Sequence, residues 1–180
     1  LHISKNAALC ERYMGKYPVI AISLKGVDAV SYQEAVVQLV EIINQSAASF
    51  QFLQNSGRLT DYEKERFCKL LDDDMNMKIM SSSMLWLTKL LEKHFNRKVV
   101  ILIDEYDVPL AKAYENGFYD EMVLLIRNIF GNVLKTNESL AFAVLTGCLR
   151  IAKESIFTGL NNFKVYSITA VSYTHLRAHE

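Results

Sequence analysis

A run of apolar residues that ends in acidic residues constrains the fold of this chain more than any other feature. Residues 99–103, Val-Val-Ile-Leu-Ile, contain no polar position, and they lead directly into Asp104, Glu105 and Asp107. A strand without polar alternation is typical of a parallel sheet that is covered on both faces by helices. Because a buried carboxylate costs free energy, the acidic residues mark the point where the strand leaves the core. The run therefore predicts carboxylates at the carboxyl edge of a parallel sheet, where open α/β sheets bind ligands.

This pattern has two interpretations. In P-loop ATPases, an apolar strand ending in Asp-Glu is the Walker B element, whose Asp holds Mg²⁺ directly or through water and whose Glu polarises the attacking water. The alternative is a buried strand followed by the start of an acidic helix, because Asp107 and Pro109 are residue types that favour helix entry. The pattern by itself leaves both interpretations open.

Strands and helices are expected to alternate along the rest of the chain. A capping box of Ser31 and Glu34 predicts that one helix begins after Ser31, and the serines 81–83 predict the start of another. Further helices are expected over residues 60–71, 108–115 and 119–134, and strands over 17–24, 99–103, 140–145 and 164–168. This order predicts an α/β fold with a parallel, doubly wound sheet and flanking helices, as in a P-loop NTPase.

Composition excludes several classes of protein. The chain has 180 residues, of which 51% are hydrophobic, so it can form one globular domain. Lys+Arg and Asp+Glu are both 20, which gives no global bias toward nucleic acid or anionic membrane, although a neutral total permits a local basic patch. The three cysteines form no C-x-x-C pair, which fits a reducing cytoplasm better than a zinc or disulfide framework. No apolar run reaches the roughly 18 residues of a membrane span.

The last ten residues are treated separately. Residues 171–180, VSYTHLRAHE, resemble the translation of an adapter used in preparing sequencing libraries. We therefore exclude them from the fold, together with the helical metal pair that His175 and His179 would otherwise suggest. The expected domain is residues 1–170, part of a longer protein that continues beyond both ends.

Four segments carry a resemblance to a known family. They are MGKYPVI at residues 14–20, IDEYDVPL at 103–110, LTGCLRIAKESIF at 145–157 and GLNN at 159–162. The chain resembles the AAA-ATPase-like family of bacterial and archaeal proteins, whose members often carry a PD-(D/E)XK nuclease-like domain after the ATPase domain. The resemblance favours the ATPase interpretation of the acidic strand end.

The resemblance implies a role for four residues. Asp104 would be the partner of Mg²⁺, and Glu105 would orient or deprotonate the attacking water. Thr146 would be a polar sensor near the γ-phosphate of ATP, or else a β-branched strand end before a turn glycine. Arg150 would stabilise charge on the phosphates, or else be a solvated residue at a helix start.

One motif of P-loop ATPases is missing. The phosphate loop requires G-x-x-x-x-G-K-[ST], but Gly15-Lys16 has Cys10 in place of the first glycine and is followed by Tyr17. It also leads into a strand, whereas a phosphate loop leads into a helix. We expect the phosphate loop and its strand to lie upstream of this chain.

The expected function is that of an incomplete ATP-binding domain from a cytoplasmic, ATP-hydrolysing protein that uses Mg²⁺ and has no membrane span. The piece itself is expected to be inactive. One alternative is a nucleotide-gated switch or scaffold with slow hydrolysis. Another is a metal-dependent phosphodiesterase that uses Asp104, Glu105 and Asp107, although neighbouring strand residues point to opposite faces and do not readily share one metal. Nuclease chemistry, if present, is expected in a later domain.

Overall fold

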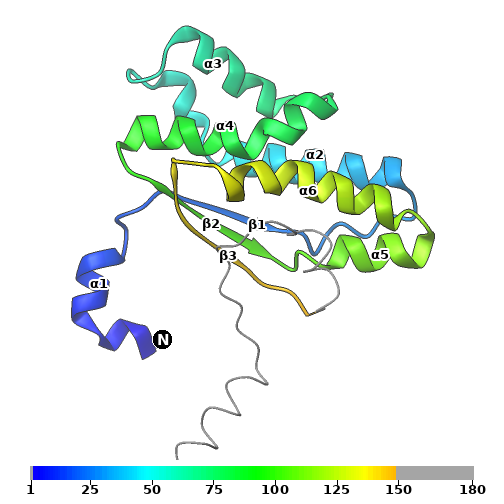
Figure 1. Ribbon diagram of the computed structural model, residues 1–180. Helices are drawn as coiled ribbons and strands as arrows, with labels where there is room; N and C mark the ends of the chain where they lie inside the picture. Colours follow the sequence, from blue (N-terminus) through cyan, green and yellow to red (C-terminus); the bar gives the residue numbers. More distant parts are fainter. Residues whose placement is uncertain (1, 149–180) are drawn as a thin grey trace, which may run out of the picture.

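The computed structural model describes residues 2–148, and its centre is a three-stranded parallel sheet in the order β1-β2-β3 (Figure 1). The strands are β1 (Val19–Ser23), β2 (Val99–Asp104) and β3 (Leu140–Leu145). The predicted α/β class, with a parallel sheet and flanking helices, is confirmed. Several predictions concern residues outside the described range. They are the strand at 164–168, the motif at 159–162, Arg150 and the tail at 171–180.

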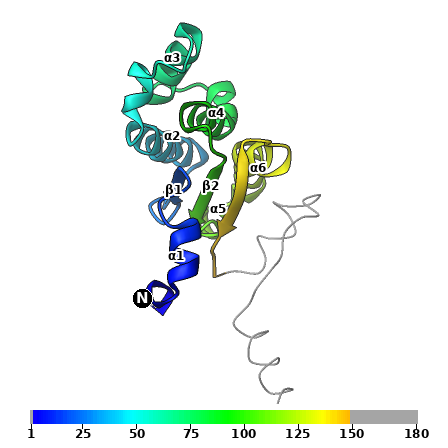
Figure 2. The ribbon, with the colours of Figure 1, turned by 90° about the vertical axis from the view of Figure 1, so that its left-hand side faces the viewer.

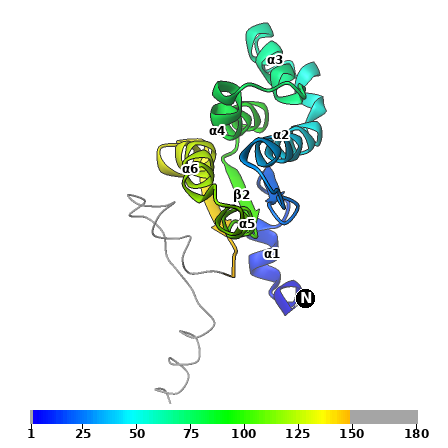
Figure 3. The same ribbon diagram turned by 90° about the vertical axis from the view of Figure 1, so that its right-hand side faces the viewer.

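Helices α2, α4 and α6 cover one face of the sheet, packing against β1, β2 and β3 respectively (Figures 1 and 2). Helix α3 packs farther out against α4, and α5 lies near the ends of β2 and β3 (Figure 3). Among residues 2–148, no helix has both the length and the apolar character needed to cross a membrane. The helices are α1 (Ala7–Tyr13), α2 (Tyr32–Ala48), α3 (Asp61–Cys68), α4 (Met77–Phe95), α5 (Val108–Asn116) and α6 (Tyr119–Lys135), with 3₁₀ turns η1 (His2–Lys5), η2 (Gln51–Asn55) and η3 (Lys69–Leu71).

The two faces of the sheet differ in burial. On the helix-covered face, Ile20, Ile101 and Ile103 are at most 1% exposed. On the other face, Leu102 is 39% and Phe142 is 52% exposed, so the described residues do not cover both faces of β2 as its apolar run predicts. The reason is topological. The crossovers from β1 to β2 and from β2 to β3 run in the same direction, and right-handed crossovers then place their helices on the same face.

The start of α2 is close to the prediction. Ser31 is the N-cap, and its hydroxyl accepts a hydrogen bond from the Glu34 backbone N–H at 3.3 Å. The Glu34 carboxylate, however, accepts from the backbone N–H of Val30, one residue before the cap. The backbone N–H groups at the N-terminus of α2 are therefore bonded by a variant of the predicted capping box.

The predicted start of α4 is wrong by about one turn. The helix begins at Met77, and the N-cap is Asn76, whose side chain accepts from the Ile79 N–H at 3.0 Å. The serines 81–83 lie inside the helix, where their hydroxyls donate to carbonyl groups of the preceding turn. Bonding of this kind lets serine occupy a helix interior, so a serine run is an ambiguous start signal.

Candidate functional site

The candidate site lies at the carboxyl edge of the sheet, where β2 and β3 end side by side. The parallel ladder continues one residue past β3, because the Thr146 N–H donates to the Ile103 carbonyl at 2.9 Å. The Tyr106 N–H in turn donates to the Thr146 carbonyl at 3.1 Å. These bonds hold the segment after β2 against the segment after β3 and bring residues about 40 positions apart in sequence together.

Asp104 and Thr146 interact directly. The Thr146 hydroxyl donates a short hydrogen bond to Asp104 Oδ1, and both side chains are exposed. The hydroxyl oxygen also accepts a long bond, 3.4 Å, from the Glu105 backbone N–H. The three residues that the family resemblance selects at these strand ends thus form one hydrogen-bonded group.

Glu105 has an unusual backbone and an unusual side chain. Its φ of 54° is in the left-handed region, which non-glycine residues seldom adopt and which costs on the order of 1–3 kcal/mol. This turn ends the alternation of side chains between the two faces of the sheet directly after Asp104. Glu105 Oε2 is buried and has no hydrogen-bond partner among the described residues. Strained backbone and an unpaired buried carboxylate oxygen are both features that cluster at functional sites.

Asp107 joins the two loops of the site. It occupies the N-cap position of α5, as its residue type suggested, but its side chain does not cap the helix. Instead one carboxylate oxygen accepts the backbone N–H of Cys148 at 2.8 Å, and the residue is only 3% exposed. Burial, together with the charge of this carboxylate, raises the pKa of neighbouring Tyr106 above its usual value.

Gly147 makes this contact between the loops possible. A Cβ placed on Gly147 would lie 2.6 Å from Asp107 Oδ1 and 2.8 Å from a ring carbon of Tyr106. Any larger residue would therefore push the two loops apart. Sequence reasoning treated Gly147 as a turn residue and missed its contact with Asp107. The available signal was the position of both residues, each just after the end of an apolar strand.

The described residues offer few ligands for a metal ion. They contain no group of three or more His, Cys, Asp or Glu side chains placed to hold one. Asp104 supplies the exposed carboxylate and Thr146 a hydroxyl. This donor set fits Mg²⁺, which keeps several waters and is usually bound through one or two carboxylates and the phosphates of a substrate.

The Gly15-Lys16 pair lies at the other end of the sheet. It forms a turn between α1 and the start of β1, with Gly15 at a φ of 67°. Because the strands are parallel, the start of β1 and the end of β2 are at opposite edges. The pair is therefore remote from Asp104.

The chain folds as an α/β protein with a parallel sheet, and this arrangement is consistent with a P-loop NTPase-like fold. The sequence matches the AAA-ATPase-like family, described as "Predicted AAA-ATPase", over residues 1–157. The chain belongs to this family. Membership supports nucleotide binding and Mg²⁺ dependence at the general level of the family.

One curated relative adds a distant similarity. The chain is 33% identical over 80 residues to an "Uncharacterized protein in vnfD 5'region" of Azotobacter chroococcum mcd 1. The similar segment is 39% of this chain and 14% of the relative, so the chain spans a small part of that protein. No solved structure matches the chain.

Proposed function

We propose that this chain is part of the nucleotide-binding domain of an ATP-hydrolysing protein, and that it carries the Mg²⁺ and water side of the site. The observation that supports this most strongly is the group formed by Asp104, Glu105 and Thr146 at the ends of two adjacent parallel strands. Membership of the AAA-ATPase-like family supports the proposal that the ligand is a nucleotide. The domain would comprise residues 1–170, and residues 171–180 would be foreign to it.

Asp104 is the proposed Mg²⁺ residue. Its carboxylate is exposed at the edge, and the Thr146 hydroxyl already fixes one of its oxygens. The other oxygen can bind the ion or one of its waters. Mg²⁺, when bound with ATP, neutralises charge on the phosphate oxygens.

Glu105 is the proposed residue for the attacking water. Its left-handed backbone turns the chain at the strand end, and its buried Oε2 lacks a hydrogen-bond partner among residues 2–148. A water molecule that donates to this oxygen would be oriented and made more nucleophilic, since a carboxylate accepts protons.

Thr146 and Arg150 are proposed to act from the loop after β3. The Thr146 hydroxyl, which orients Asp104, is also placed to respond to a phosphate near the metal. Arg150 lies outside the described residues, and its proposed role in stabilising phosphate charge rests on the family resemblance. Within the described residues, the Asp107 carboxylate holds the backbone N–H of Cys148, two residues before Arg150 in sequence.

The phosphate cradle is proposed to come from a strand upstream of the described residues. The crossovers from β1 to β2 and from β2 to β3 run in the same direction across the sheet. Within residues 2–148, the side of β3 that faces away from β2 pairs with no other strand. A further strand could pair with this side of β3 and connect to β1. Its connection would cross the sheet in the opposite direction to the other two. This reversal would create a topological switch point, where α/β sheets bind ligands, next to Thr146. A nuclease-like domain after the ATPase domain is a further expectation from the resemblance.

Of the alternatives, the phosphodiesterase finds less support. It requires Asp107 as a ligand together with Asp104 and Glu105, but the Asp107 carboxylate is buried and bonded to Cys148. A switch with slow hydrolysis would use the same residues as an ATPase. Only a turnover measurement on the full-length protein separates these two.

Calorimetric titration with Mg·ATP tests the proposal. The full-length protein is expected to bind with a Kd in the micromolar range, and the 180-residue chain is expected to show no binding at that level, because backbone amides of the phosphate loop supply much of the affinity. Micromolar binding by the 180-residue chain would contradict the proposal that it holds half of the site. Absence of binding by the full-length protein would contradict the nucleotide function itself.

A further inference from the structure

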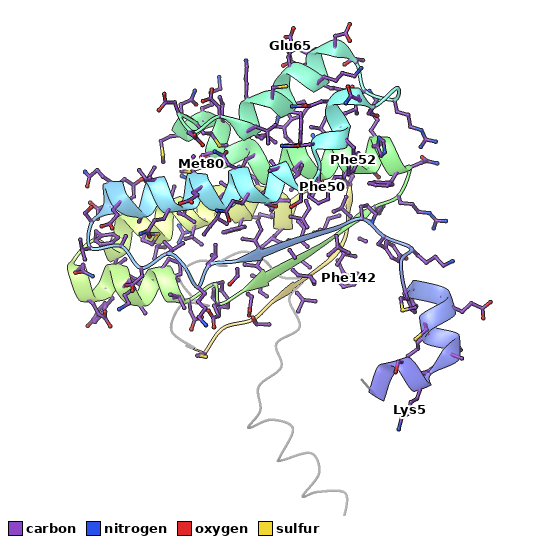
Figure 4. The ribbon with its side chains drawn as sticks, turned by 180° about the vertical axis from the view of Figure 1, so that it is seen from behind. Lys5, Phe50, Phe52, Glu65, Met80 and Phe142 are labelled. Carbon is purple, nitrogen blue, oxygen red and sulfur yellow. The ribbon has the colours of Figure 1, made fainter. Side chains whose placement is uncertain are left out.

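A second functional surface lies at the amino edge of the sheet, where α4 ends and the chain turns into β2. Here Phe52 is 41% and Phe95 is 44% exposed. The His94 ring contacts both, with its centroid 4.9 Å from that of Phe52 and 4.7 Å from that of Phe95, and the two phenylalanine rings lie 5.7 Å apart. Figure 4 labels Phe52 at this end of the molecule, with Phe50 beside it at a ring distance of 6.2 Å.

Hydrogen bonds hold His94 in place, and Phe52 and Phe95 pack against its ring. His94 Nδ1 lies 2.8 Å from the hydroxyl of Ser56, which is only 3% exposed. The Arg58 guanidinium donates to the His94 carbonyl at 2.8 Å and so satisfies one of the last carbonyls of α4. Asn96 ends the helix in the left-handed conformation, with a φ of 52°. Exposed rings that are already fixed lose little conformational entropy when they bind a partner.

Three basic residues are close to the rings: Arg58 donates to the His94 carbonyl, and Arg97 and Lys98 follow shortly after Phe95. Arg58, Arg97 and Lys98 are all exposed. In the described part of the chain, none of the three belongs to an ion pair, whereas Lys93 of α4 is paired with Glu63 at 2.6 Å. Glu65, an exposed acid of α3, lies on the outer side of that helix, away from Phe52 (Figure 4). This end of the sheet thus carries three cations without an ion pair among residues 2–148, although the acidic Glu92 and Glu138 lie at the same end.

We propose that this aromatic–basic surface, formed by Phe52, Arg58, His94, Phe95, Arg97 and Lys98, binds single-stranded nucleic acid. Proteins that bind single strands combine aromatic rings, on which bases stack, with cations that contact the phosphates. The surface lies at the opposite edge of the sheet from Asp104, so a bound strand and a bound nucleotide would not compete.

Fluorescence anisotropy with a labelled single-stranded oligonucleotide of roughly 20 nucleotides tests this proposal, since single-strand sites commonly span about 4–16 nucleotides. The 180-residue chain is expected to bind with a slope of log K against log salt of about −2, as three phosphate contacts predict. Phe52→Leu and Phe95→Leu, which keep apolar bulk, are each expected to weaken binding at least about five-fold through loss of base stacking. Arg97→Glu combined with Lys98→Glu should weaken binding further and flatten the slope by about 1.4.

Two control variants make the test specific. Lys25→Glu combined with Lys78→Glu produces the same change in charge on exposed residues, one just after β1 at the opposite end of the sheet and one at the start of α4. Tyr114→Ala removes an aromatic ring that is 76% exposed on α5. Both controls are expected to bind like the wild type, and thermal unfolding followed by circular dichroism checks that every variant folds. Absence of binding by the wild type would overturn the proposal. So would equal weakening by the control charge reversal, or wild-type affinity in both leucine variants.

Discussion

The two edges of one small sheet carry opposite chemistry. At the carboxyl edge, Asp104, Glu105 and Asp107 follow β2, and two loops are hydrogen-bonded to each other. At the amino edge, Arg97 and Lys98 precede the same strand, next to exposed aromatic rings. A buried apolar strand must place its polar neighbours at its ends, so one run of sequence specifies both edges. We propose that the first edge binds a metal and its anionic ligand and that the second binds an anionic polymer.

Thr146→Val is expected to cause a large loss of activity, smaller than that of a change at Glu105. The substitution keeps the size and branching of the side chain but removes the hydroxyl that donates to Asp104. A hydrogen bond to a charged group contributes about 1.5–3 kcal/mol, so ATP turnover by the full-length protein should fall by about 10- to 100-fold. Steady-state phosphate release measures this change. Thr136→Val, at the end of α6, is the control, and equal loss in both variants would contradict a specific role of Thr146.

Gly147→Ala is expected to destabilise the protein by about 1–3 kcal/mol, the usual cost of forcing an extra carbon into a packed site. The new Cβ would lie 2.6 Å from Asp107 Oδ1 and would break the contact between the loops. Urea unfolding measures the loss. Gly26→Ala is the matched control, because a Cβ at Gly26 meets nothing within 4 Å. Equal stability of the two variants would show that the loops tolerate separation.

A smaller, pH-dependent effect is expected at Glu63, whose carboxylate pairs with Lys93 of α4. Partial burial raises the pKa of this carboxyl, but hydrogen bonds from Lys93 and Thr60 outweigh burial and lower the pKa below its ordinary 4.5. A lowered pKa stabilises the fold above pH 4.5, and this stabilisation is lost as the pH falls through the folded-state value. Glu63→Gln should therefore flatten the acid side of a plot of unfolding free energy against pH. Glu65→Gln is the control and should leave the curve unchanged.

Sequence reasoning succeeded where a single physical requirement decides the outcome. The uninterrupted apolar runs before Asp104 and Thr146 identified two strands that end together, because a core excludes carboxylates. It failed where alternatives are close in free energy. The serines 81–83 could cap a helix or bond inside it, and Asp107 could cap α5 or bind the Cys148 N–H.

Two other features could not be predicted from local pattern at all. The left-handed turn at Glu105 is imposed by the pairing of segments about 40 residues apart, which no local preference of glutamate suggests. The exposed face of β2 depends on the direction of two crossovers, although the apolar run of that strand indicates burial on both sides. Tertiary context decides both.

The central claim is that Glu105 acts on the attacking water while other groups bind the nucleotide. The most direct test is ATP turnover and Mg·ATP affinity of full-length protein carrying Glu105→Gln, with Glu138→Gln at the amino edge as the control. We expect turnover to fall by about 10²- to 10⁴-fold, the usual contribution of a general base, with affinity within about two-fold of wild type. Undiminished turnover in the Glu105→Gln variant would contradict the account.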